Sequence, residues 1–461
     1  MDYSAANAGL WNVFVYLGVI AGLLLLGNVL NRKVAVVRNS LLPVSALAGF
    51  LLLIIRNTGL FDVPADTLDM ITYHGIALGF IALSLRTVKD SRGGAYAFKS
   101  GALIVSTYLM QALVGLFISV VLAYTFMPGL FKASGILLPM AYGQGPGQAN
   151  NVGSTYEALG FIGGRSFGLS LAAAGYLSAC LVGLWYTRYL VKNKGYVIRT
   201  HDYVSGSITV DTFEDENEVP IAESVDRLST QVALVLLTYL LTYGVTLGIS
   251  SLVEAVAPGF AKTLSPLLWG FNFITGSLVA MGISGILKAL RKNKVMTRQY
   301  QNNYLLNRIS GLCFDLMIVA GIAAIDIGDL KGLWTPFLLM AVLGAITTYY
   351  FVKKLCYVLT PDFREESFVA MYGMLTGTIS SGILLLRQID PELKTPAADQ
   401  LVIGSGTAIL FGAPMLLLIG FAPQSTGMLF LTIALCALYM AVLVAYILGW
   451  RPARRKAQKS E

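Results

Sequence analysis

The chain has 461 residues, of which 56% are hydrophobic and only 13% are charged. Soluble domains carry about 25% charged residues, so this composition excludes an ordinary soluble protein and indicates an all-α polytopic membrane protein. The net charge of +8 does not indicate nucleic-acid binding, because the basic residues fall in short loops between apolar runs. The expected surroundings are therefore a lipid bilayer, and no nucleic-acid partner is predicted.

The first residues of the chain contain neither Lys nor Arg before the first apolar run. They lack the basic region of a secretory signal and favour an N-terminus outside the cell. All four cysteines lie within apolar runs, which is typical of small core residues rather than of disulfides or metal ligands. These cysteines are Cys180, Cys313, Cys356 and Cys436.

Eleven apolar runs are candidates for membrane spans, because a spanning helix needs about 20 mostly apolar residues. They cover 9–30, 39–55, 69–86, 98–126, 163–190, 229–255, 264–287, 306–325, 333–359, 398–420 and 425–449. The second and seventh contain Pro43 and Pro266 near their starts. Short or Pro-interrupted segments in corresponding positions of two halves point to the discontinuous helices of transporters.

The Lys and Arg residues predict the orientation of the chain in the membrane. With the N-terminus outside, all but a few of the 33 fall in cytoplasmic loops and in the tail. Those left outside are Arg56, Lys132, Arg165, Lys262 and Lys331. The positive-inside rule therefore predicts a cytoplasmic C-terminus in a bacterial-type inner membrane.

Two glycine-rich stretches cannot form ordinary spanning helices. Met140–Gly160 carries closely spaced glycines with Pro146, which disfavours a regular helix, and a partner stretch starts at Met371. Irregular polar backbone at membrane depth is tolerated where protein buries it or where it lines a wet cavity. We therefore expect two re-entrant hairpins, at about 133–161 and about 367–392, which enter from opposite faces.

The chain is expected to contain two inverted repeats. Each hairpin follows four spans and precedes a fifth, and an odd number of spans turns the second half upside down. The first repeat covers 1–191 and the second covers 229–424. A cytoplasmic acidic linker over 192–228 joins them, and an extra span with a basic tail over 425–461 stands outside the repeat.

Several motifs resemble those of the glutamate:sodium symporters, the ESS family. The run Tyr142-Gly143-Gln144-Gly145-Pro146-Gly147 is similar to the family's Gly-Gly-His-Gly-Thr-type motif. Two further segments look like those of the family, Tyr156–Phe161 and Thr187–Gly195, and a third, Gly373–Gly382, does so more loosely. The resemblance reaches about residue 420. It implies the same inverted repeats and a homodimeric carrier that couples sodium to the uptake of L-glutamate or a related anion.

Three features depart from the family pattern and concern the cargo more than the fold. Gln144 stands where the family has His. Pro146 and Gln148 are atypical of the family. Asp315 is an acid in a span that carries no charge at that point in the family. Asp315 lies about 15 Å into its predicted span, close to the midplane of a core about 30 Å thick. An ionisable residue at that depth is a candidate for ion coupling, with a structural ion pair as the alternative.

The hairpins supply the candidate binding groups. Carbonyl, hydroxyl and amide oxygens replace water around Na⁺, and free amides at helix N-termini suit a carboxylate. The substrate-binding candidates are Gln144, Gly145, Gly147, Gln148, Asn150, Asn151, Thr376, Gly377, Thr378, Ser380, Ser381 and Arg387. Ser154 and Thr155 join Asp315 as candidates for ion coupling. The simpler alternative is that these groups only satisfy the backbone of their own hairpins.

Other polar residues carry weaker expectations. Arg165 is expected to anchor the chain at the interface, and His74 to be hydrogen-bonded within the protein. Gln111 and Asn272 are expected to line the path or to bridge helices. No triad, ATP-binding loop or metal-binding cluster indicates an enzyme, and no cofactor is expected besides the sodium ion. Another organic anion carried with protons, a channel and a sensor without turnover remain open as alternatives.

Overall fold

The computed structural model of the protein describes residues 7–87, 94–194, 196, 221–296, 300–390 and 393–449. Most of the acidic linker and the basic tail beyond Gly449 therefore lie outside the described residues. Within those ranges the regular structure is entirely helical, which confirms the all-α class. The helical segments have the following bounds: α1 Ala8–Lys33, α2 Ala35–Asn39, α3 Val44–Asn57, α4 Ala65–Ser84, α5 Gly94–Tyr124, η1 Lys132–Ile136, η2 Pro139–Gly143, α6 Pro146–Ala158, α7 Gly164–Lys194, α8 Ile221–Val256, α9 Pro258–Gly270, α10 Asn272–Lys292, α11 Asn303–Ala323, η4 Gly328–Leu330, α12 Trp334–Leu359, α13 Arg364–Thr376, α14 Ile379–Leu386, α15 Ala397–Phe421 and α16 Thr426–Ile447.

The described residues contain 10 helices that are long and apolar enough to cross a membrane. They are α1, α4, α5, α7, α8, α10, α11, α12, α15 and α16. Their bounds agree with the expected spans to within a few residues, except at the N-terminus of α8 and at both ends of α10. The polytopic membrane architecture is therefore confirmed at this level, because the apolar runs become helices that satisfy their own backbone.

Two of the eleven expected spans differ from the structure. The run over 39–55 becomes α3, a helix of only 14 residues that begins after Pro43. The run over 264–287 is not one helix, because the chain breaks at Phe271 between α9 and α10. Pro266 lies inside α9 rather than at this break. Phe271, the residue at the break, is apolar, so hydropathy gives no sign that a helix ends there.

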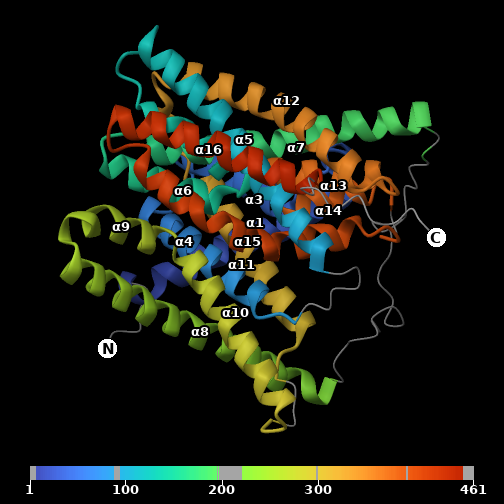
Figure 1. Ribbon diagram of the computed structural model, residues 1–461. Coiled ribbons are helices and arrows are strands. Elements are labelled where there is room, and N and C mark those ends of the chain that lie inside the picture. The colour runs from blue at the N-terminus through green and yellow to red at the C-terminus, as the bar shows by residue number, and fades with distance from the viewer. Residues whose placement is uncertain are drawn as a thin grey trace, which may run out of the picture.

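The helices form two bundles. In bundle one, α11 packs between α3 and α4, α10 packs on α4 and α8, and α1 covers α3. In bundle two, α5 packs against α12, α15 and α16, while α7 packs against α6 and α13. Figure 1 shows α5, α12 and α16 in the upper part of the molecule and α8, α9 and α10 in the lower part. We assign α9 to bundle one because its main neighbour is α8.

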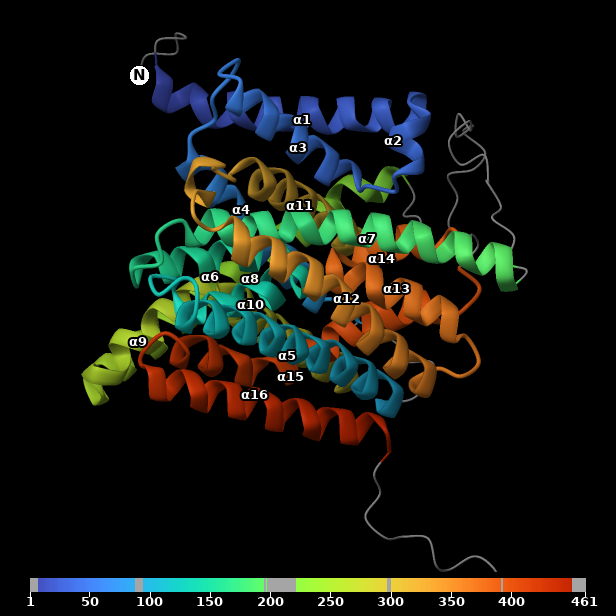
Figure 2. The same cartoon turned by 90° about the horizontal axis from the view of Figure 1, so that it is seen from above.

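Contacts between the bundles are concentrated on one short helix. α6 belongs to bundle two through α7, yet it also touches α4, α9 and α11 of bundle one. Figure 2 shows α1 and α3 at one edge of the molecule and α15 and α16 at the other, with α6 and α7 between them. α6 therefore lies where the two bundles meet.

Candidate functional site

The first glycine-rich stretch contains a break between two helices. A π-helical turn ends at Gly143, and α6 starts at Pro146, where a proline loses no helical hydrogen bond. Between them, Gly145 has φ +90°, a conformation that side chains rarely adopt. The glycines and the proline that excluded an ordinary helix in the sequence therefore form this break.

The second stretch breaks in the same manner. α13 ends at Thr376, and α14 begins at Ile379 after Gly377 and Thr378. A β-carbon on Gly382 of α14 would lie 2.5 Å from the Ala370 carbonyl oxygen of α13, so a glycine at this position lets the two segments pack this closely. Each of the two glycine-rich stretches therefore consists of two helical segments with a break between them.

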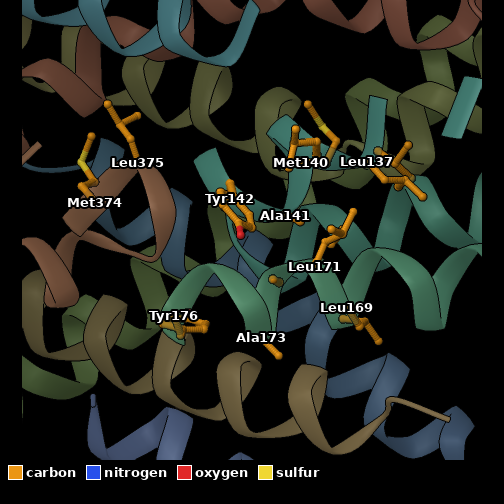
Figure 3. Packing of buried hydrophobic residues seen from close by; sticks show 14 of the residues in the cluster. Leu137, Met140, Ala141, Tyr142, Leu169, Leu171, Ala173, Tyr176, Met374 and Leu375 are labelled. Atoms are coloured by element: carbon orange, nitrogen blue, oxygen red, sulfur yellow. The ribbon is translucent and has the colours of Figure 1, made fainter. Parts of the chain in front are cut away.

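The two breaks touch each other. A β-carbon on Gly145 would lie 3.7 Å from Thr378 Cγ2 and 3.9 Å from the Gly377 carbonyl oxygen. α7 supports the second break at Gly175, whose β-carbon would lie 2.3 Å from the Thr376 carbonyl oxygen. Figure 3 shows the buried side chains of Tyr142, Tyr176 and Met374 in this part of the core. Segments more than two hundred residues apart therefore meet at one point.

A cavity of about 130 Å³ opens beside this point. Bundle one lines it from α4, α10 and α11, and bundle two lines it from α5, α15 and both breaks. The cavity therefore lies between the bundles rather than inside either one. Gln144, Gly377, Thr378 and Ser380 line the cavity, as expected for members of a binding site.

Buried polar atoms without hydrogen-bond partners gather around the breaks. Gln148 is fully buried, and neither its Oε1 nor its Nε2 has a partner. Ser381 Oγ and Asn150 Oδ1 also lack a hydrogen-bond partner. Native proteins leave few such groups unpaired, and an unpaired group costs about 1–3 kcal/mol. The cluster therefore has hydrogen-bonding capacity to offer a ligand.

Other residues that were expected to bind substrate or ions make hydrogen bonds or packing contacts within the protein. Asn151 Nδ2 donates to the Gly270 carbonyl oxygen at 2.7 Å, and Thr155 Oγ1 donates to the Asn151 carbonyl oxygen at 2.8 Å. Thr376 Oγ1 likewise donates to the Tyr372 carbonyl oxygen at 2.8 Å. Gly147 packs α6 closely against Ile76 of α4. Ser154 is half-buried.

The two expected charged residues do not line the cavity. Arg387 is exposed just after α14. Asp315 lies in the middle of α11, beside Ser45 of α3 and within electrostatic range of Tyr176. Because Tyr176 also lies beside Thr378, Asp315 is linked to the second break through one aromatic side chain. Asp315 is thus placed next to the site, and Arg387 is not.

The structure also assigns partners to the other polar residues within the membrane. Gln111 Nε2 donates to Thr348 Oγ1 at 3.0 Å and to the Leu375 carbonyl oxygen at 2.9 Å. Gln111 therefore bridges α5, α12 and α13 beside the second break. His74 Nδ1 and Asn272 Nδ2 both contact Tyr239 Oη, at 2.7 and 3.0 Å. Both expectations of helix bridging and of a hydrogen-bonded histidine are confirmed.

Polar links join the bundles next to α6. Arg165 at the start of α7 forms an ion pair with Asp69 of α4, and its backbone N–H donates to Glu157 Oε1 at 3.0 Å. Ser166 Oγ donates to Asp329 Oδ2 at 2.8 Å. The sequence predicted an interfacial anchor at Arg165, and the structure adds its partner.

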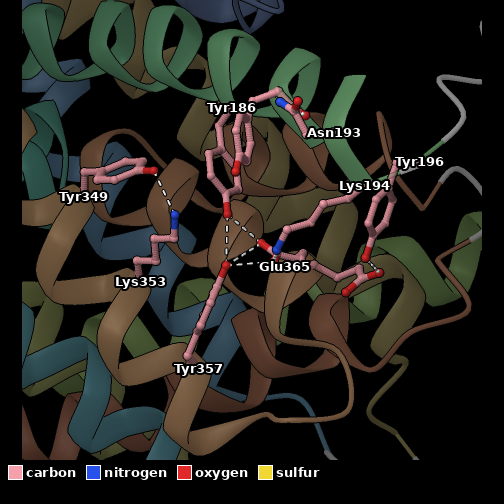
Figure 4. Close-up of polar contacts among 10 residues, drawn as sticks. Tyr186, Asn193, Lys194, Tyr196, Tyr349, Lys353, Tyr357 and Glu365 are labelled. Carbon is pink, nitrogen blue, oxygen red and sulfur yellow. Dashed lines mark hydrogen bonds and ion pairs between the residues drawn. The ribbon is translucent and has the colours of Figure 1, made fainter. Parts of the chain in front are cut away.

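A second polar cluster surrounds Glu365 in the first turn of α13 (Figure 4). Its carboxylate forms an ion pair with Lys194 and accepts hydrogen bonds from Tyr186 Oη at 2.6 Å and Tyr357 Oη at 2.7 Å. Burial alone raises the pKa of Glu365, but these hydrogen bonds and the Lys194 charge outweigh it and lower the pKa below its ordinary value. Lys353 Nζ lies 4.7 Å from the centroid of the Tyr186 ring.

Most of the cavity wall was not among the residues that the sequence singled out. Tyr108, Phe80, Phe273 and Phe314 line the cavity from three helices of bundle one and from α5. In the sequence each lies within an apolar run and looks like any core or lipid-facing residue. A β-carbon on Gly143 would lie 2.3 Å from the Tyr108 ring, a contact that only the structure shows.

Comparison with models of known protein families finds no matching family, and comparison with curated protein sequences finds no matching relative. The functional argument therefore rests on the residues, the breaks and the cavity themselves.

Proposed function

We propose that the protein is a secondary active transporter that couples the movement of sodium ions to the uptake of a small organic anion. L-glutamate, the cargo that the family resemblance implies, is the first substrate to test. The observation that supports this proposal is the contact of the two helix breaks beside a cavity between two bundles. Discontinuous helices that meet at a repeat interface are typical of substrate sites in secondary transporters.

The chemistry of the breaks supports an anionic cargo with a coupled cation. The N-termini of α6 and α14 present free backbone N–H groups and positive dipole ends, which stabilise a carboxylate. Carbonyl groups at the ends of the preceding segments, with hydroxyls such as that of Thr378, supply oxygens of the kind that bind Na⁺. Asp315 is the candidate for coupling, because it is an acid at membrane depth beside Ser45.

The location of the cavity supports a mechanism of alternating access. A site between two bundles opens to one side or the other when one bundle moves relative to the second. In this proposal α6 and the two breaks move with bundle two, and the Arg165–Asp69 ion pair breaks during the cycle. The inverted repeats, the re-entrant hairpins, the N-terminus outside and the homodimer belong to the same proposal.

One alternative keeps the fold and changes the coupling ion. Asp315 lies within electrostatic range of Tyr176, and an acid at membrane depth is able to carry a proton through the cycle. Proton coupling then predicts uptake driven by a pH gradient without sodium.

Reconstitution in liposomes tests the proposal directly. Purified protein should accumulate L-glutamate or a related carboxylate above equilibrium when a sodium gradient is imposed, and a proton gradient should do so under the alternative. Flux that never exceeds equilibrium indicates a channel. If no carboxylate exchanges or accumulates under either gradient, the transporter proposal is wrong.

A further inference from the structure

The cavity between the bundles has an uncharged wall. Among its lining residues there is no Lys, Arg, His, Asp or Glu in the described part of the chain. Its polar side chains are Tyr108, Gln144, Thr378, Ser380 and Ser405, all of which belong to bundle two. A binding site for a substrate with two carboxylates needs donors at two places, and here the polar groups all lie on one side.

The facing wall is aromatic and belongs to bundle one. Phe80 of α4 packs against Phe273 of α10 with ring centroids 5.2 Å apart, and against Phe314 of α11 with centroids 5.3 Å apart. Phe271 continues this cluster, with its ring centroid 6.0 Å from that of Phe273. Rings from three helices therefore form one apolar surface across the cavity from the helix breaks. Such a surface stabilises an apolar group and penalises a buried charge.

The polar wall has room for one carboxylate. It contains the N-terminus of α14 and the Thr378 hydroxyl, a donor at the second break that lies beside Tyr176. Gln148, fully buried and without hydrogen-bond partners, lies in the first turn of α6 next to the other break, although it does not line the cavity.

We propose that the substrate is a monocarboxylate with an apolar body, rather than a dicarboxylate such as glutamate. Its carboxylate binds at the helix breaks, where Thr378 and the α14 N-terminus donate, and its apolar body packs on Phe80, Phe273 and Phe314. This inference rests on the proposed transport function and narrows its substrate class. The second carboxylate of glutamate would face aromatic rings. Arg387, the cation that the sequence suggested for binding a carboxylate, is exposed and does not line the cavity.

Competition in proteoliposomes tests the inference with substrates matched in size. 4-Methylpentanoate and pentanoate carry one carboxylate and an apolar body, whereas glutarate and L-glutamate carry two carboxylates. We expect the first pair to be taken up, or to exchange, at least tenfold more efficiently than the second. Equal or preferred uptake of glutamate or glutarate overturns the inference while the transport proposal stands. The absence of any uptake or exchange by all four overturns both.

A variant of the aromatic wall separates the apolar body from the carboxylate. Phe80→Leu should weaken the binding of 4-methylpentanoate at least fivefold more than that of acetate, which has a carboxylate and almost no apolar body. The matched control is Phe98→Leu, because Phe98 is 42% exposed and is not among the lining residues. Elution as a single species and unchanged thermal unfolding establish that both variants fold. Equal losses for both ligands in Phe80→Leu would show that the rings do not contact the cargo.

Discussion

Glu365 is the acceptor that joins the ends of three helices. Lys194 comes from α7, Tyr357 from α12 and Glu365 itself from the first turn of α13. The carboxylate is only 4% exposed, so its charge is compensated by these partners rather than by water. The base of the second broken segment is thereby fixed to two long helices, which positions the break at the other end of α13.

Glu365→Gln should therefore destabilise the protein, because the amide loses the charge that Lys194 pairs with. Removing one partner of a buried pair costs about 3–5 kcal/mol, and the partly exposed Lys194 places this case near the lower end. Thermal unfolding in detergent measures the loss. Asp362→Asn is the matched control, since Asp362 is an exposed acid in the same region and its replacement should leave the unfolding temperature unchanged.

The lowered pKa of Glu365 also predicts the pH dependence of stability. An acid whose pKa is lower in the folded state stabilises that state fully above its unfolded pKa, which is about 4.5 for a glutamate, and loses this contribution as the pH falls through the folded pKa. Between about pH 6 and about pH 3, the unfolding temperature of the native protein should fall more than that of Glu365→Gln. Parallel curves for the two proteins would contradict this role.

At the scale of elements, close approaches at glycines hold the broken segments against the long helices. Gly175 allows α7 to contact the end of α13, and a β-carbon there would lie 2.3 Å from the Thr376 carbonyl oxygen. The backbone oxygen cannot move without displacing the break. This contact acts directly on the end of α13, two residues before Thr378.

Gly175→Ala should displace the second break and reduce both stability and transport. Overpacking costs about 1–3 kcal/mol of folding free energy. Because the displacement acts on the break itself, the rate of substrate exchange should fall by more than this loss of stability explains. Gly244→Ala provides the control, because Gly244 also lies within a long helix and nothing lies within 4 Å of its added methyl group. A Gly175→Ala protein with normal exchange would show that the break tolerates this shift.

The sequence predicted the long helices, and it marked the two glycine-rich stretches as unable to form ordinary spanning helices. Apolar length favours a membrane helix, whereas closely spaced glycines and a proline disfavour a regular one. The break at Phe271 was missed because a phenylalanine carries no such signal. α3 was read as a span because its apolar run is continuous with the residues before Pro43.

The candidate site was predicted only on its polar side. Gln144, Gly377, Thr378 and Ser380 line the cavity as expected, since polar residues stand out in apolar surroundings. The aromatic wall could not be predicted, because its rings come from α4, α10 and α11 and only the tertiary fold brings them together. Local sequence likewise did not show which acid pairs with Arg165, since Asp69 lies 96 positions away.

At the scale of the whole molecule, the two bundles meet along α6. A β-carbon on Gly270 of α9 would lie 3.5 Å from Thr155 Oγ1 of α6. A cysteine at position 155 would place its Sγ near the position of Oγ1, so cysteines at the two positions come close enough to form a disulfide after a small adjustment. Such a link would join bundle one to bundle two beside the cavity without crossing it.

Thr155→Cys combined with Gly270→Cys, in a background where the four native cysteines are replaced by alanine or serine, should trap the bundles in the arrangement described here. If transport requires one bundle to move, oxidation should abolish net uptake of the substrate identified in liposomes, and a reductant should restore it in the same preparation. Substrate binding should survive oxidation, because the breaks remain in contact. Each single-cysteine variant is the control, and its uptake should not respond to oxidation. Full uptake by a completely cross-linked protein would show that the cargo crosses without relative movement of the bundles.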